Sequence, residues 1–230
     1  AAICEMLDNG VTAFADHYFH ADRICDAVLE TGIKGDIAPT VFGMGSDFAG
    51  QLEEASVLIQ AKNRISSRLK LRMGPHSPYT CPEGTLKAIV DRAKYLGVGI
   101  HIHVSETDEQ VTESLKAYSQ TPFERLYTAG GFDVPCIIAH GLWILEMDRK
   151  YLNKKTHLAV CPKTYMKLGM GYGGIWDDSH RLPLCMGTDG AASSNTLSPL
   201  EQVRLFALIG KFIKNDPTVF TLAELWQMLM

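Results

Sequence analysis

The chain has 230 residues, of which 46% are hydrophobic, and its formal net charge is −4. A chain of this size can bury one substantial core, so we expect a single domain over residues 1–230. The sequence has no run of Lys or Arg. It therefore shows no surface suited to nucleic acid or to an anionic membrane, and we expect a small-molecule partner.

Three features of the sequence predict where in the cell the protein is found: its apolar stretches, its N-terminal residues and the spacing of its cysteines. No stretch reaches the roughly 18 apolar residues that a membrane helix needs, and the first ten residues have no basic segment before an apolar one. The six cysteines are widely spaced, and we interpret them as reduced core thiols. These features predict a soluble cytoplasmic protein.

Short β-rich segments alternate with longer amphipathic segments along the chain. The predicted strands lie at 11–18, 35–43, 69–76, 98–106, 134–141, 156–162 and 182–190. Segments with apolar residues at spacings of three and four, typical of helices, lie between them at 21–32, 52–65, 83–97 and 108–120. This repeated order predicts a parallel sheet with right-handed crossovers. A long glycine-rich loop is expected at 163–181, with His180 in a structural role.

Seven strands of this kind favour an α/β fold, a TIM-type (β/α)8 barrel that lacks one strand, over an open doubly wound sheet. The distribution of polar side chains supports the barrel, because such barrels carry their active sites at the carboxyl ends of the strands. The residues at or near these predicted strand ends are Asp16, His17, His76, His103, His140 and Asp189.

A hydrolytic metal site needs imidazoles and carboxylates that converge on one ion and leave a position open for water. His103 and Asp189 are the candidate ligands. Glu106 lies three residues beyond His103, where it could shuttle protons, and His140 could bind the metal or hydrogen-bond the attacking water. His17 could line the pocket, but a solvated or helix-capping role is the expectation for it.

We expect structural roles for two further histidines that lie close to these candidates in the sequence. His20 follows the first predicted strand, and we expect it to be solvated or to cap a helix. His101 is two residues before His103 on the same strand face, and we expect it to pack beside the site or support it.

Five motifs occur in an order that resembles the amidohydrolase superfamily. They are PHSPYT at 75–80, HVSET at 103–107, AHG at 139–141, MKLG at 166–169 and GTDGAASSN at 187–195. The resemblance is to the branch that contains methylthioadenosine/S-adenosylhomocysteine deaminases, related nucleobase deaminases and triazine hydrolases. It spans nearly the whole chain.

The resemblance implies a role for each candidate residue. His103 and Asp189 would bind one divalent metal ion, zinc or iron, and Asp189 would also accept a proton. Glu106 would contact the substrate and carry protons to the leaving group or a ring nitrogen. His140 would orient the hydroxide, and His76 would contact the substrate.

The sequence also departs from the pattern of that family. Family members carry a His-x-His pair at the end of the first barrel strand, which would lie before Ala1, so the visible strands correspond to strands two to eight. The family's small β-sandwich and last helix are likewise not found in residues 1–230. Many deaminases of this branch have N-P-x-S-N before MKL, whereas residues 161–165 read CPKTY. The exact substrate therefore stays open.

The leading hypothesis is a metal-dependent hydrolase in which a metal-bound hydroxide deaminates a purine- or nucleoside-like amino-heterocycle. A triazine-type chlorohydrolase is one alternative. A catalytically silent barrel fragment with an incomplete metal site is the other. Because a barrel without its first strand has two unpaired edges, association with another segment or a second copy of the chain is also expected.

Overall fold

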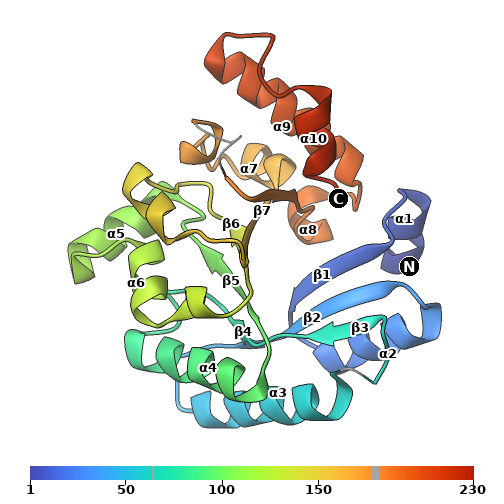
Figure 1. The fold of residues 1–230 in the computed structure, drawn as a ribbon, viewed down its shortest axis with the longest axis vertical. Helices are drawn as coiled ribbons and strands as arrows, with labels where there is room; N and C mark the ends of the chain where they lie inside the picture. Colours follow the sequence, from blue (N-terminus) through green and yellow to red (C-terminus); the bar gives the residue numbers. More distant parts are fainter. Residues whose placement is uncertain (64, 178–181) are drawn as a thin grey trace.

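The computed structural model describes residues 1–63, 65–177 and 182–230 (Figure 1). The strands are β1 Ala13–Tyr18, β2 Lys34–Val41, β3 Leu69–Leu71, β4 Gly74–Pro75, β5 Ile100–Val104, β6 Cys136–His140, β7 Thr156–Val160 and β8 Leu184–Met186. The α-helices are α1 Ala2–Asp8, α2 Ala21–Thr31, α3 Phe48–Lys62, α4 Glu83–Leu96, α5 Asp108–Tyr118, α6 Pro122–Thr128, α7 Pro162–Lys167, α8 Ala191–Ser194, α9 Pro199–Lys214 and α10 Leu222–Gln227.

The predicted strands are all present, and the segment predicted at 69–76 is divided into β3 and β4. The helices predicted between them are present as α2, α3, α4 and α5, with α3 beginning earlier than expected, at Phe48. Gly32 and Gly97 end α2 and α4 in the left-handed conformation, with φ of 75° and 65°. A residue without a Cβ adopts this conformation at little cost, so these glycines stop the helices where the sequence predicts.

The strands form two parallel groups, β1-β2-β3 with β4 beside β2, and β5-β6-β7-β8. Backbone hydrogen bonds join the groups: His101 donates to the carbonyl of Met73, and His103 donates to the carbonyl of His76, each at 3.0 Å. The strands therefore follow one another in chain order around a curved wall, with α2, α3, α4 and α6 outside it (Figure 1). This is a partial TIM-type barrel, as predicted.

Burial explains why the wall is stable. The strands β2 and β5 are buried over most of their length, because the helices cover one face and the barrel interior covers the other. Buried side chains from both strand groups and their covering helices belong to one hydrophobic cluster. No helix in the described ranges is long and apolar enough to cross a membrane.

The barrel is open between β1 and β8. Among the residues that the structure describes, no strand pairs with the outer edge of β1. On the other side, the backbone N–H of Met186 in β8 donates to the carbonyl of Met228, at 2.9 Å. Across the opening, Glu5 of α1 accepts a hydrogen bond from the backbone N–H of Leu197, at 2.8 Å.

Two expectations about local structure need correction. The segment 163–181 is not one long loop, because α7 and a 3-10 turn at Gly174–Trp176 occupy part of it; His180 lies outside the described residues. The cysteines are all free, but Cys4 is exposed and Cys185 is half-buried, so they are not all core thiols. Cys4 is exposed because α1 buries none of its residues.

Candidate active site

The predicted site residues follow the carboxyl ends of neighbouring parallel strands. His103 lies in β5 and Glu106 follows that strand. His140 is the last residue of β6, and Asp189 follows β8. Because the strands are parallel, their carboxyl ends meet at one end of the barrel, and the fold brings these side chains to the same region.

A helix cap sets the position of Glu106. The side chain of Thr107 accepts a hydrogen bond from the backbone N–H of Gln110, at 3.3 Å, which starts α5. The side-chain oxygen of Gln110 in turn accepts a hydrogen bond from the backbone N–H of Glu106, at 3.0 Å. The turn between β5 and α5 is therefore fixed by hydrogen bonds at the backbone of Glu106 and at the side chain of Thr107.

The ring orientation of His103 is set by a backbone group. Its Nδ1 lies 2.7 Å from the carbonyl oxygen of His76. A carbonyl oxygen can only accept, so Nδ1 carries a proton, and Nε2 is the nitrogen that remains for a metal ion. This is the arrangement that metal-binding histidines use, in which the second ring nitrogen donates to a backbone or carboxylate oxygen.

Glu106 and His140 form the most direct contact between two predicted catalytic residues. Nε2 of His140 lies 3.6 Å from Oε1 of Glu106. Burial lowers the pKa of His140, and the carboxylates of Glu106 and Asp189 only partly oppose this shift. The imidazole is therefore neutral near pH 7, beside two carboxylates.

Backbone strain is present at these strand ends. Ser105, His140 and Asp189 adopt positive φ values of 49°, 72° and 59°. Such conformations cost a residue that has a Cβ about 1–3 kcal/mol each. The packing around the strand ends holds these three residues there, which turns the side chains of His140 and Asp189 away from the directions that a regular strand would give them.

His76 lies just after β4 and is held through one ring nitrogen. Its Nδ1 lies 2.9 Å from the hydroxyl oxygen of Thr80, and that hydroxyl is 2.7 Å from the hydroxyl of Ser77. Burial, with a smaller contribution from His103, lowers the pKa of His76 to about 4. The rings of His76 and His103 are 4.9 Å apart, so His76 is a neutral neighbour of the candidate metal ligand.

The expectation for His17 was wrong. Only 9% of this residue is exposed, and its ring stacks on that of His103 with centroids 4.8 Å apart. Its Nε2 donates to the carbonyl of Gly74, at 3.1 Å. His17 occupies the same kind of strand end as the predicted residues, and that position was the signal that could have placed it in the site. His20 is exposed, as expected, but its side chain makes no capping hydrogen bond to α2.

His101 is buried beside His17, with ring centroids 5.0 Å apart, and burial lowers its pKa to about 3. It packs next to the site, as expected.

Polar atoms without a partner gather in this region. Among the described residues, Nδ1 of His17, His101 and His140 and Oγ of Ser105 are buried and have no hydrogen-bond partner. An unpartnered buried polar atom costs about 1–3 kcal/mol, so several such atoms together are unusual outside a functional site.

The candidate ligands supply some, but not all, of the protein groups that a metal ion needs. His103 offers the Nε2 lone pair and Asp189 a carboxylate. In the part of the chain that the structure describes, no group of three or more His, Cys, Asp or Glu side chains is arranged to hold a metal. Catalytic zinc takes three protein ligands as a rule. His103 and Asp189 therefore suit two ligand positions, and the described residues do not complete the set.

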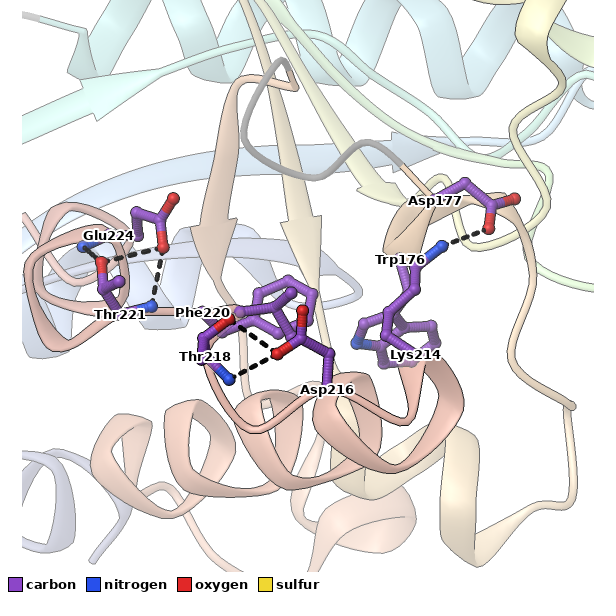
Figure 2. A pocket seen from close by; sticks show the side chains of 9 residues that line it. Trp176, Asp177, Lys214, Asp216, Thr218, Phe220, Thr221 and Glu224 are labelled. Carbon is purple, nitrogen blue, oxygen red and sulfur yellow. Dashed lines mark hydrogen bonds and ion pairs between the residues drawn. The ribbon is translucent and has the colours of Figure 1, made fainter.

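A separate pocket of about 430 Å³ opens near the end of α9 (Figure 2). Lys214 and Asp177 form an ion pair at 2.9 Å on one side of it, and Thr221 and Glu224 at the start of α10 lie on the other. None of the candidate site residues lines this pocket. Its polar groups are already paired with one another, and we assign it no role in the chemistry.

Comparison with known proteins identifies the chain's relatives. Residues 1–229 match the model of the amidohydrolase family. The chain is 37% identical, over 216 residues, to a 5-methylthioadenosine/S-adenosylhomocysteine deaminase from Pelotomaculum thermopropionicum, which covers 93% of the chain and 50% of that protein. The chain spans about half the length of the curated relatives it matches.

Solved structures show the same fold. A zinc-bound adenosine deaminase from Xanthomonas campestris is similar with a TM-score of 0.89 and 25% identity, over 97% of this chain and 52% of that one. A zinc-bound atrazine chlorohydrolase from Arthrobacter aurescens is similar with a TM-score of 0.87 and 20% identity, over 100% of this chain and 56% of that one. The second likeness concerns the fold alone.

Proposed function

The chain belongs to the amidohydrolase family, and from this premise we propose that the protein is a metal-dependent hydrolase that deaminates an amino-heterocycle. The contact between Glu106 and His140, beside His103 and Asp189 at the same strand ends, is the observation that carries the proposal. It brings a carboxylate and a neutral imidazole together beside two side chains of the kinds that bind metal ions.

His103 and Asp189 would hold one divalent metal ion, zinc or iron, with the remaining ligands coming from outside the described residues. When bound, such an ion lowers the pKa of a coordinated water towards 7. The hydrogen bond from His103 Nδ1 to the carbonyl of His76 keeps Nε2 directed as a ligand throughout. Lengthening this bond would turn the ring and weaken the site.

The other residues move and direct protons. Asp189 would accept a proton from the attacking water. Glu106 would carry the second proton of the water to the ring nitrogen, and the proton held by Asp189 would pass to the amino group, which leaves as ammonia as the C–N bond breaks and the C=O bond forms. His140, neutral because of burial, would hydrogen-bond the attacking water and orient it.

The names of the relatives support the proposed substrate class. Those matching over most of the chain are named for deamination of methylthioadenosine and S-adenosylhomocysteine, and we propose a planar amino-heterocycle of that kind, with His76 and Glu106 in contact with it. Residues 161–165, CPKTY, leave the nucleoside part undefined. Triazine hydrolysis and a silent site are the competing proposals.

Ammonia release by the natural polypeptide, purified with its metal, tests the function. We expect turnover of at least one substrate among adenosine, methylthioadenosine, S-adenosylhomocysteine, guanine and a pterin. Release of chloride from atrazine without ammonia from any of these would favour triazine hydrolysis. Absence of all turnover, together with no tightly held metal in elemental analysis, would support the silent alternative.

A further inference from the structure

Four aromatic side chains cluster at the carboxyl ends of β1, β2 and β4, and three of them contact the ring of His76. They are Tyr18, Phe19, Phe42 and Tyr79, and we call them the aromatic rim. Tyr18, Phe19 and Tyr79 are 49%, 54% and 43% exposed, and Phe42 is half-buried. Single exposed aromatics are ordinary, but a group of them beside buried polar residues indicates a binding surface.

The rim has a defined ring geometry. Phe42 stacks on His76 with centroids 4.5 Å apart and planes 25° apart, and Phe19 stacks on Phe42 at 5.9 Å and 24°. Tyr18 and Tyr79 meet His76 edge-on, at 6.1 Å and 5.8 Å. These are the offset-stacked and edge-to-face arrangements that aromatic rings prefer, so the rim is an ordered surface and not a loose collection of side chains.

The rim borders the candidate active site directly. The carbonyl of His76 accepts a hydrogen bond from the ring of His103, so the residue that the rim contacts also orients the candidate metal ligand. Tyr79 also meets the ring of His76, and that ring lies 4.9 Å, centroid to centroid, from the ring of His103. A ligand lying on the rim would therefore lie next to the candidate metal ligand.

Phe42 is fixed by its backbone as well as by its ring. Its N–H donates to the side-chain oxygen of Gln51 in α3, at 3.0 Å, which anchors the residue just after β2. An anchored ring loses little conformational freedom when a ligand stacks near it. Phe19 is the outermost ring of the stacked series and the most exposed of the four, so its face is the one most open to a ligand.

We propose that the aromatic rim binds the planar ring of the substrate by stacking and thereby selects flat heterocycles. This inference rests on the proposed function, since the ligand is the heterocycle that the site would deaminate. Rigid aromatic side chains suit this role, because every heterocycle offers a π-face whatever its substituents.

The test measures binding of the deaminated products inosine and xanthine, which keep the planar ring but have no amino group to lose. Isothermal titration with the metal-loaded natural polypeptide would compare wild type with Phe19→Leu, Tyr79→Leu and the double variant. Leucine keeps the apolar character but removes the flat ring. We expect each single change to weaken binding about 5- to 150-fold and Phe19→Tyr to restore it to within about twofold, because tyrosine keeps the flat ring.

Tyr95 provides the matched control. It is 81% exposed and lies near the carboxyl end of α4, which leads into the start of β5, so Tyr95→Leu should leave binding unchanged. If the double variant binds the products and releases ammonia as wild type does, the proposed role of the rim is wrong. The proposed function would not be affected by that result. Failure of wild type to bind either product or to deaminate any heterocycle would overturn both.

Discussion

Nε2 of His140 lies 3.6 Å from Oε1 of Glu106, which connects the last residue of β6 to the turn that follows β5. The two side chains come from positions 34 residues apart in sequence, 140 minus 106, and meet because β5 and β6 are adjacent parallel strands. The contact gives the candidate site a carboxylate that has a neutral imidazole beside it.

Glu106→Gln should abolish proton transfer while keeping the size of the side chain. We expect the rate of ammonia release to fall by about 10²- to 10⁴-fold, which is the usual contribution of a positioned acid or base. Steady-state kinetics measures it. Glu109→Gln, an exposed change in the first turn of the helix α5 that follows Glu106, is the control and should keep full activity. Equal activity in the two variants would remove Glu106 from the mechanism.

His103→Ala should weaken metal binding. Loss of a supporting residue around a metal typically costs 10- to 100-fold in affinity, and loss of a ligand should cost at least about 100-fold. Metal content after dialysis, measured by elemental analysis, reports this. His157→Ala removes an exposed histidine at the start of β7 and should leave the metal content unchanged. A variant at His103 that retains a full metal ion per chain would contradict the assignment.

Gly74→Ala should lower the stability of the fold. A Cβ at Gly74 would lie 2.5 Å from the carbonyl oxygen of Pro39 and 2.8 Å from the ring of His17. Overpacking of this kind lowers the free energy of unfolding by about 1–3 kcal/mol. Chemical denaturation measures the change.

Gly84→Ala serves as the control for that experiment. A Cβ at Gly84, near the start of α4, meets nothing within 4 Å. Because alanine favours helix over glycine, this variant should be as stable as wild type or more stable by up to about 1 kcal/mol. Equal losses at both glycines would show that the contact with Pro39 and His17 is not the cause.

Thiol labelling should separate the cysteines by burial. Burial raises the pKa of Cys25 to about 11 and that of Cys136 to about 12, so at pH 8 their reactive thiolates are scarce as well as enclosed. With iodoacetamide at that pH, Cys4 should be modified first, and Cys25 and Cys136 should react at least about 100-fold more slowly. Labelling of the buried thiols should rise with pH, because thiolate forms as the pH approaches the raised pKa.

Peptide mapping by mass spectrometry reads out each site. In denaturant all the cysteines should react at similar rates, and Cys4→Ser should remove the fast phase from the folded protein. Rapid modification of Cys136 in the folded chain would contradict the packing of β6.

The architecture was largely predictable because it depends on periodic patterns. The alternation of apolar runs and amphipathic segments fixes the order of strands and helices, and glycines such as Gly32 and Gly97 mark helix ends through their backbone conformation. The division of residues 69–76 into β3 and β4 was not predictable, because it arises from pairing of Gly74 with Thr40 in β2.

Single positions were harder to predict when their role depends on three-dimensional neighbours. His17 was expected to be solvated or to cap a helix, yet it is buried against His101 and His103.

The sequence by itself determined the α/β class, the order of the strands and the candidates His76, His103, Glu106, His140 and Asp189, because residue type and spacing along the chain carry that information. Only the tertiary structure decided which nitrogen of His103 is protonated, that Glu106 meets His140, and that His17 and the aromatic rim surround the site. These features depend on distances between separate strands and on burial, and a one-dimensional pattern specifies neither.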